Sequence, residues 1–257
     1  TEQKMLLKKV YKSFVRNGIS LPEEQQARLR EINKELSTLQ QKFGNNLLAE
    51  TNDFKLVIDN EEDLAGLPEN IRTAAAEMAK ENGQEGKWMF GLQKPSWIPF
   101  LQYSERRDLR EKMYKAYINR GNNDNENDNK QIILQIITLR QEKARLLGFE
   151  TPADFILDDT MAKKSDVVNA FLLDIFKAAN EKAKAELAEM QAIADREGNG
   201  VKIEAWDWDY YAEKLRQEKY AMNESEIKPY FQMENVRAGV FAVANKLYGI
   251  NFEKLDS

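Results

Sequence analysis

The chain has 257 residues, of which 42% are hydrophobic and 32% charged, with only 12 glycines and 6 prolines, and this composition favours a mainly α protein. Its 43 acidic and 38 basic residues give a formal net charge of -5, which offers no broad positive field for nucleic acid. It contains no histidine and no cysteine, so disulfides, thiol nucleophiles and imidazole triads are excluded, and a catalytic zinc would need an all-carboxylate shell.

Membrane and export signals are missing from the sequence. No apolar run reaches the length of about 18 residues that a membrane-spanning helix needs. The N-terminal TEQKMLLKKV has too short an apolar core for a signal peptide. We therefore expect no membrane partner and a cytoplasmic location. Because the sequence begins at Thr1 and not at methionine, we also expect the native start to be missing, together with any export signal.

Helical spacing of apolar residues predicts two helices in the first 51 positions. The first covers residues 4–18 and stops at Asn17-Gly18. The second opens with Pro22 and Glu23, both favoured in a first turn. Its apolar positions alternate by three and four, which predicts packing against a neighbouring helix; a free coiled-coil dimer is the alternative. These positions are Leu29, Ile32, Leu36, Leu39 and Phe43.

The helical spacing of apolar residues ends at Asn52, and the residues from about 52 to 92 are predicted to form a small β insertion. Residues 54–58 and 87–92 are each rich in strand-forming side chains and predict two short strands that pair as a hairpin or small sheet. An alanine-rich helix is predicted between them, over residues 68–82.

Pro95 and Pro99 stand on either side of Trp97, and we expect them to hold the chain ahead of a helix over residues 105–120. Five cations on this helix resemble a basic patch. Three acids interleave with them at spacings that let opposite charges meet, so a solvated helix face is the preferred interpretation. The cations are Arg106, Arg107, Arg110, Lys112 and Lys115, and the acids are Glu105, Asp108 and Glu111.

The polar stretch 121–129, GNNDNENDN, invites comparison with a calcium loop. With Asp124 as the first ligand, Glu126 and Asp128 occupy the third and fifth positions. The sixth position is then Asn129 where glycine is needed, and the twelfth is Gln135 where a bidentate glutamate belongs. We therefore interpret the stretch as a loop whose Asn and Asp residues form turns and an N-cap.

Two further helices follow this loop. Apolar spacing predicts the first from residue 130 to Gly148. The second is long, from Ser165 or Asp166 to about Glu197, and would exceed about 40 Å. Its apolar stripe consists of Val168, Phe171, Leu172, Ile175, Phe176, Ala179, Leu187, Met190 and Ile193.

The region from Trp206 to Phe252 predicts two amphipathic helices joined by a turn of defined conformation. Asn223 begins a polar break, and the proline after Lys228 disfavours a helical conformation there. The apolar positions are Trp208, Tyr211, Ala212, Leu215 and Met222 in the first helix, and Val236, Val240, Val243 and Leu247 in the second.

Acid–base candidates are limited to carboxylate pairs. Asp207 and Asp209 lie next to Trp206 and Trp208, where partial burial would raise a carboxylate pKa. The preferred interpretation is that Asp207 caps the helix that follows and Asp209 interacts with the first-turn dipole. We interpret the pair formed by Asp158 and Asp159 in the same way.

Four tyrosines, Tyr210, Tyr211, Tyr220 and Tyr230, offer both ring area and a hydroxyl. They fit a peptide-binding channel or burial in the helix pair equally well. We name no catalytic, cofactor-binding or metal-ligating residue in this chain.

Four stretches resemble one known family. They are SWIPFLQYSERRDLREKMYKAY at 96–117, LRQEKARLLGF at 139–149, DDTMA at 158–162, and the region 206–252. In the last stretch the order Trp-Asp-x-x-Tyr-Tyr, Lys-Tyr, Lys-Pro-Tyr-Phe and Leu-Tyr-Gly-Ile-x-Phe resembles the segment upstream of the active site in the thimet oligopeptidase family of zinc metallopeptidases, peptidase family M3. The Trp-Asp-Trp variant looks closest to the bacterial peptidyl-dipeptidase branch. The resemblance runs from about Tyr11 to Phe252.

The resemblance implies a clam-like, zincin-type oligopeptidase. In that family zinc is held by the two histidines of His-Glu-x-x-His and a later glutamate, and the glutamate of the motif activates water. That motif lies downstream of the matched segment, and this chain does not contain it. We therefore expect residues 1–257 to form one helical region, truncated at the C-terminus and also at the N-terminus. The region would supply channel walls and a substrate-access surface.

The resemblance predicts that the parent protein is a zinc peptidase that hydrolyses short peptides and releases C-terminal dipeptides. This chain alone is expected to bind no zinc and to be inactive. The alternative is a non-catalytic helical protein-interaction module. Truncation would expose apolar helix faces, so we expect self-association through dimers, or a mobile end.

Overall fold

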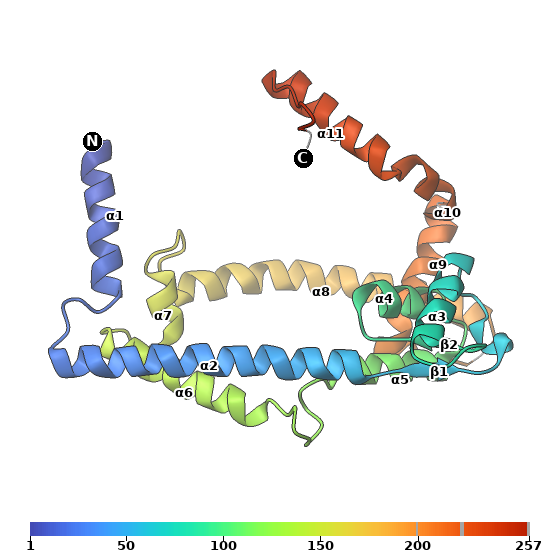
Figure 1. The fold of residues 1–257 in the computed structure, drawn as a ribbon, viewed down its shortest axis with the longest axis horizontal. Coiled ribbons are helices and arrows are strands. Elements are labelled where there is room, and N and C mark those ends of the chain that lie inside the picture. Colours follow the sequence, from blue (N-terminus) through green and yellow to red (C-terminus); the bar gives the residue numbers. More distant parts are fainter. Residues whose placement is uncertain (199, 222–223, 256–257) are drawn as a thin grey trace. The chain divides into compact units, whose positions relative to one another are not determined.

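The computed structural model describes residues 1–198, 200–221 and 224–255, and it confirms a mainly α chain with one short sheet (Figure 1). The chain divides into two compact units, Thr1–Tyr211 and Ala212–Ser257. The elements in the first unit are α1 (Glu2–Arg16), α2 (Glu23–Asp53), β1 (Leu56–Ile58), η1 (Glu61–Leu64), α3 (Glu69–Glu81), β2 (Trp88–Phe90), α4 (Lys94–Tyr103), α5 (Arg107–Ile118), α6 (Lys130–Leu146), α7 (Pro152–Leu157), α8 (Ser165–Arg196) and η2 (Ala205–Asp207). They are followed by α9 (Trp208–Tyr220), which crosses the boundary, and then by α10 (Glu224–Ile227), η3 (Lys228–Phe231) and α11 (Met233–Tyr248).

Helices α2 and α6 lie side by side in the first unit (Figure 1). They are antiparallel, because Arg28 near the start of α2 contacts Glu142 near the end of α6, while Asn46 contacts Asn129 at the other end. Their shared core consists of Ile32, Leu36, Ile132, Ile136 and Leu139. The predicted seam along α2 therefore packs against a neighbouring helix of the same chain.

A second core lies around the small sheet. Strands β1 and β2 pair antiparallel, with Leu56 opposite Phe90 and Ile58 opposite Trp88, which confirms the predicted pairing. Helices α3, α4 and α5 complete this core, whose buried members are Leu56, Ile58, Leu64, Leu67, Ala75, Phe90, Leu92, Phe100, Leu101 and Met113.

Pro95 and Pro99 were expected to hold the chain ahead of the next helix, and the structure places both of them in a helix that was not predicted, α4. Pro95 lies in the first turn, where a backbone N–H has no helical acceptor and its loss costs nothing. Pro99 lies inside the helix and removes one hydrogen bond, but Phe100 and Leu101 are fully buried against the sheet. The burial of these two side chains offsets the missing bond.

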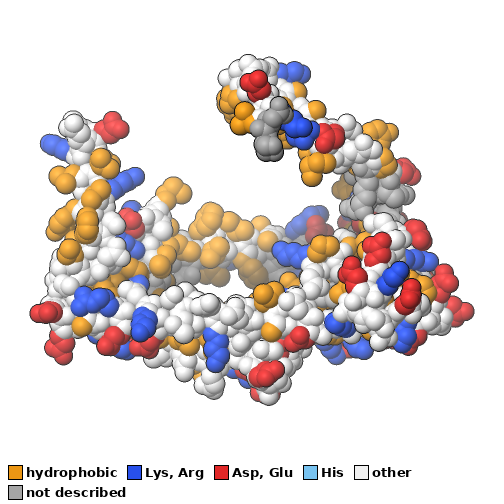
Figure 2. Space-filling model, in the orientation of Figure 1, with side chains coloured by type: hydrophobic (Ala, Val, Ile, Leu, Met, Phe, Trp, Pro, Cys, Tyr) orange, Lys and Arg blue, Asp and Glu red, His pale blue; other side chains and the backbone are white. Residues whose placement is uncertain are grey.

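Helix α8 confirms the predicted long helix, with 32 residues and a length of about 48 Å at 1.5 Å per residue. Its C-terminal end buries Met190, Ile193 and Ala194. Every side chain from 169 to 179 is exposed, including Phe171 at 63%. Figure 2 shows hydrophobic side chains gathered along α8 and along α1, which buries none of its residues.

Helices α9 and α11 confirm the two helices predicted in the last region. The Lys-Pro-Tyr-Phe segment between them forms the short turn η3, and α11 ends at Gly249, whose φ of 68° is the left-handed conformation of a helix C-cap. Helix α11 buries none of its residues. Met222 and Asn223 lie outside the described residues.

Within the described ranges, no helix combines the length and the apolar character that crossing a membrane requires.

Candidate functional site

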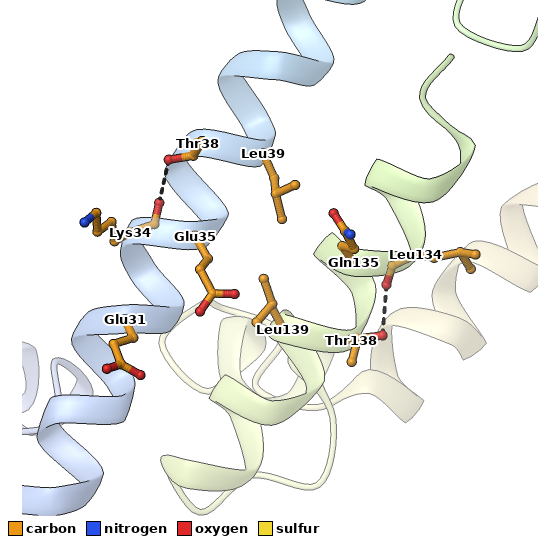
Figure 3. A pocket seen from close by; sticks show the side chains of 9 residues that line it. All are labelled: Glu31, Lys34, Glu35, Thr38, Leu39, Leu134, Gln135, Thr138 and Leu139. Carbon is orange, nitrogen blue, oxygen red and sulfur yellow. Dashed lines mark hydrogen bonds between the residues drawn. The ribbon is translucent and has the colours of Figure 1, made fainter. Parts of the chain in front are cut away.

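A groove of about 730 Å³ lies between α2 and α6, within the size range of ligand-binding clefts (Figure 3). Leu39 and Leu139 point toward each other across it. Thr38 and Thr138 donate their hydroxyl hydrogens to the backbone carbonyls of Lys34 and Leu134, at 3.1 and 2.9 Å. These hydroxyls are therefore engaged within their own helices.

Arg28 binds the carboxylates along this side of the helix pair. Its guanidinium donates two hydrogen bonds to Glu142, at 2.7 and 2.8 Å, and it contacts Glu31 at 3.3 Å and Glu35 at 3.2 Å. The hydrogen bond from Arg28 lowers the pKa of Glu142. Because these carboxylates are ion-paired, the groove offers contact area and polar groups, with no carboxylate poised as a general base.

The groove residues could not be assigned to a site from sequence. Glu31 and Thr138 are separated by about a hundred positions, and the helical periodicity of α2 and α6 does not specify which helix each one meets. The only local signal was the apolar seam of α2, which included Leu39.

Asp207 does not cap the helix that follows it, contrary to our expectation. Its carboxylate accepts hydrogen bonds from Arg107 at 2.8 Å and from Arg110 at 2.7 Å, and from the backbone N–H of Glu204 at 3.1 Å. Asp207 is 0% exposed and Arg110 is 2% exposed. Arg110 therefore forms a buried ion pair with Asp207, and Arg107, whose side chain is 39% exposed, pairs with the same carboxylate from the surface. Both contacts correct the assignment of these arginines to a solvated helix face.

Other charges on that helix behave as expected for a solvated surface. Lys115 pairs with Glu111 one turn away, and Arg106 pairs with Asp108 at 2.8 Å and with Asp63. The interleaved pattern therefore predicts part of the helix correctly. It fails at the positions that face Asp207.

Asp209 lies in the first turn of α9, as predicted, and burial raises the pKa of its carboxyl. Both features weighed from the sequence, the first-turn position and the partial burial, are present at this residue. A raised pKa alone does not make a catalytic acid, because no second titratable group is placed beside it in the described contacts.

Asp158 and Asp159 bind α1, and the interpretation that they cap a helix is wrong, because the N-cap of the next helix, α8, is Lys164. Lys12 contacts them at 2.8 and 3.0 Å, and Arg16 contacts Asp158 at 3.1 Å. The hydrogen bond from Lys12 lowers the pKa of each carboxyl. Arg16 also donates to the backbone carbonyl of Phe155 at 2.8 Å and lies 4.3 Å above its ring.

The loop 121–129 surrounds a carboxylate from another element. Glu50 of α2 accepts hydrogen bonds from the backbone N–H of Gly121 and from the side-chain amides of Asn123 and Asn125, the last two at 2.9 and 2.7 Å. Asn125 and Asp128 form the expected turns by accepting from backbone N–H groups two residues later. The loop interpretation is therefore supported by its hydrogen bonds.

The helix cap predicted in this loop differs in detail. Asn129 precedes α6 but makes no side-chain cap hydrogen bond. Its amide instead accepts from Asn46 at 3.0 Å and donates to the carbonyl of Phe43 at 3.2 Å, because the side chain is buried against α2.

The four tyrosines divide between burial and exposure. Tyr211 is buried and donates its hydroxyl hydrogen to Glu197 at 3.2 Å, and the ring of Tyr210 receives the guanidinium of Arg110 at 4.1 Å. Tyr220 and Tyr230 are exposed, and Tyr230 lines a hollow of about 590 Å³ with residues of α11. Burial thus explains Tyr211, while Tyr230 is available on the surface.

No cluster of three or more potential metal ligands occurs among the residues that the structure describes. With no histidine or cysteine in the whole chain, these residues do not fit a catalytic zinc.

Comparison with known proteins identifies the family. The model of peptidase family M3 matches residues 100–257, more than half of the chain. The chain is 36% identical over 258 residues to dipeptidyl carboxypeptidase of Escherichia coli strain K12, covering 100% of this chain and 38% of that protein. It is 37% identical over 257 residues to dipeptidyl carboxypeptidase of Salmonella typhimurium, covering 99% and 38%.

A third relative carries a different name. Oligopeptidase A of Haemophilus influenzae is 36% identical over 252 residues, covering 96% of this chain and 37% of that protein. The chain thus spans 37 to 38% of the length of these three relatives. From its family-model match and from the motifs noted in the sequence, the chain belongs to peptidase family M3.

Proposed function

We propose that these residues are part of a zinc-dependent peptidase that hydrolyses short peptides and releases C-terminal dipeptides. The observation that carries the proposal is the match of the whole chain to dipeptidyl carboxypeptidase, a relative whose name states that activity. Oligopeptidase A is almost equally similar, so cleavage inside short peptides is the second specificity that the experiments must distinguish.

In this proposal the zinc ligands lie outside these 257 residues, since the chain has no histidine or cysteine. The chain itself contributes channel walls and a substrate-access surface. Three features support that role: the groove between α2 and α6, the length of α8, and the exposed apolar faces of α1 and α8. Such walls would select substrates by access, admitting short unstructured peptides.

The test compares two proteins made from the same gene: the 257-residue chain, and a version that continues through the residues encoded after Ser257. The chain alone should leave short peptides intact with or without zinc. The longer protein should cleave them and lose activity when zinc is chelated. Mass spectrometry of the products separates dipeptide release from internal cleavage. A longer protein that leaves short peptides intact with zinc supplied refutes the proposal.

The alternative is a helical interaction module without catalysis. The feature that favours it is the midsection of α8, defined as the exposed residues 169–179, which include Phe171 and Phe176. Its signature would be a natural stop codon after Ser257 and a tightly bound protein partner. Reading the gene beyond that codon is the simplest way to separate the two.

A further inference from the structure

A second hollow, of about 600 Å³, lies where α7 packs against α6, and residues of α2 complete its lining. Its lining is mainly apolar and includes Leu36 of α2 together with Phe155, Ile156 and Leu157 of α7. Two cations of α6, Arg140 and Lys143, also line it. The volume and the mixture of apolar surface with few polar groups are typical of a small-ligand site.

The two cations have no carboxylate within ion-pairing distance in the part of the chain that the structure describes. The ammonium of Lys143 donates a hydrogen bond to the side-chain oxygen of Asn33 at 2.7 Å and lies 6.0 Å from the centre of the Phe155 ring. Burial lowers the pKa of Lys143. The neighbouring cations differ, because Arg16 and Arg28 are each paired with a carboxylate.

The helix dipole explains only part of this arrangement. Lys143 lies in the last turn of α6, where a cation is favoured, but Arg140 does not. Lys143 is half-buried and Arg140 is exposed, and both residues line an apolar hollow. An anion stabilises two such cations, since it compensates their positive charges and the hydration that Lys143 has lost.

We propose that this hollow binds the C-terminal residue of a peptide, with its carboxylate between Arg140 and Lys143 and an apolar side chain against Phe155, Ile156 and Leu157. The inference rests on the proposed function, which supplies short peptides as ligands. Charge complementarity defines the occupant: the planar guanidinium matches a carboxylate, and the apolar lining selects a carboxylate attached to a hydrophobic side chain.

Binding is measured by calorimetry on the 257-residue chain with an unstructured pentapeptide that ends in phenylalanine. The free acid should bind about tenfold or more tightly than the same peptide with a C-terminal amide, because hydrogen bonds to a charged group are lost in the amide. A C-terminal glycine should also weaken binding. A straight-chain fatty acid distinguishes the other source of a carboxylate and should bind more weakly than the peptide acid.

Variants locate the site. Arg140→Gln and Lys143→Gln should each lower the affinity for the peptide acid about tenfold and reduce the difference between acid and amide. Arg145→Gln is the matched control, because it removes a positive charge from the same helix at a position that does not line this hollow. Circular dichroism of each variant confirms that the helices are intact.

Equal affinity for acid and amide overturns the proposal, as does tighter binding of the fatty acid than of the peptide. An effect of Arg145→Gln as large as that of Arg140→Gln also overturns it, since the peptide would then respond to general positive charge. The readout is binding by this chain. It therefore fails or succeeds independently of whether the longer protein hydrolyses peptides.

Discussion

Asp207, Arg107 and Arg110 join two segments that are distant in sequence, because both arginines lie on α5 and Asp207 lies in η2. The carboxylate of Asp207 is fully buried and accepts from both arginines, while Arg110 also donates to the backbone carbonyl of Ser104 at 2.7 Å. Removing one member of such a buried pair leaves the remaining charge without compensation.

Asp207→Asn should therefore lower the free energy of unfolding by about 3–5 kcal/mol, measured by urea denaturation. Asp53→Asn is the matched control, since Asp53 is exposed at the end of α2, and its effect should stay within about 0.5 kcal/mol. Equal losses in the two variants would show that the ion pair does not stabilise the fold.

Glu50 should make the stability of the fold depend on pH, because its pKa is lowered in the folded state. Burial alone would raise the pKa of Glu50, but hydrogen bonds from Gly121, Asn123 and Asn125 outweigh it and lower the pKa. A carboxyl with a lower pKa in the folded state binds fewer protons there than in the unfolded state. Its stabilisation is complete above the unfolded pKa of about 4.3 and is lost as the pH falls through the folded value.

Glu50→Gln should cost about 1–3 kcal/mol of stability at neutral pH, since hydrogen bonds to a charged acceptor are weakened. It should also flatten the loss of stability on acidification below about pH 4.3. Urea denaturation at a series of pH values measures both effects. Glu126→Gln, at an exposed position of the same loop, should change neither. If its acid profile matches that of Glu50→Gln, the assignment to Glu50 is wrong.

At the scale of elements, α1 is held largely by charge. It buries no residue, and its contacts with α7 and the residues after it pass through Lys12 and Arg16. Partly exposed ion pairs are screened by salt, so the attachment should weaken as ionic strength rises.

Asp158→Asn should release α1 without unfolding the rest of the unit. Amide hydrogen exchange of residues 2–16 should become faster, and the remaining sensitivity to salt should decrease. Asp174→Asn, at an exposed position on α8, serves as the control and should leave that exchange unchanged. Unaltered exchange in Asp158→Asn would mean that another contact holds the helix.

Elements were predicted well because their signals are local. The long helix α8 and the paired strands follow from periodicity and from strand-forming side chains within a few residues of each other. The buried ion pair could not be predicted in this way, since Asp207 and Arg110 are 97 positions apart. The groove between α2 and α6 could not be predicted for a similar reason. Periodicity shows which face of a helix is apolar, and it does not show which helix will cover that face.

The family was predicted on a different basis. The Trp-Asp-x-x-Tyr-Tyr motif and its companions resemble M3 peptidases, and the family match confirms that assignment. The structure now gives part of this motif a physical role, because Asp207 is the buried partner of two arginines.

At the scale of the whole molecule, the exposed apolar residues of α8 bear on self-association. The midsection of α8 exposes Phe171, Leu172, Ile175 and Phe176 within the described chain, and contiguous apolar patches promote association. We expect the 257-residue chain to form dimers that sediment faster as concentration rises. A double variant, Phe171→Lys with Phe176→Lys, should remain monomeric, while Met161→Lys at an exposed loop position should not differ from the original chain. A compact monomer at every concentration would contradict this expectation.

The same midsection acts as a fixed spacer. Both ends of α8 are attached, since Ser165 donates a hydrogen bond to Asp154 at 2.8 Å and the far end buries Met190 and Ile193. Removing a single residue between them would shorten the helix by about 1.5 Å and rotate everything beyond it by about 100°. Met190 and Ile193 would then face solvent. Residues 169–179 can therefore change identity at little cost to this unit, whereas their number is fixed by the geometry of the helix.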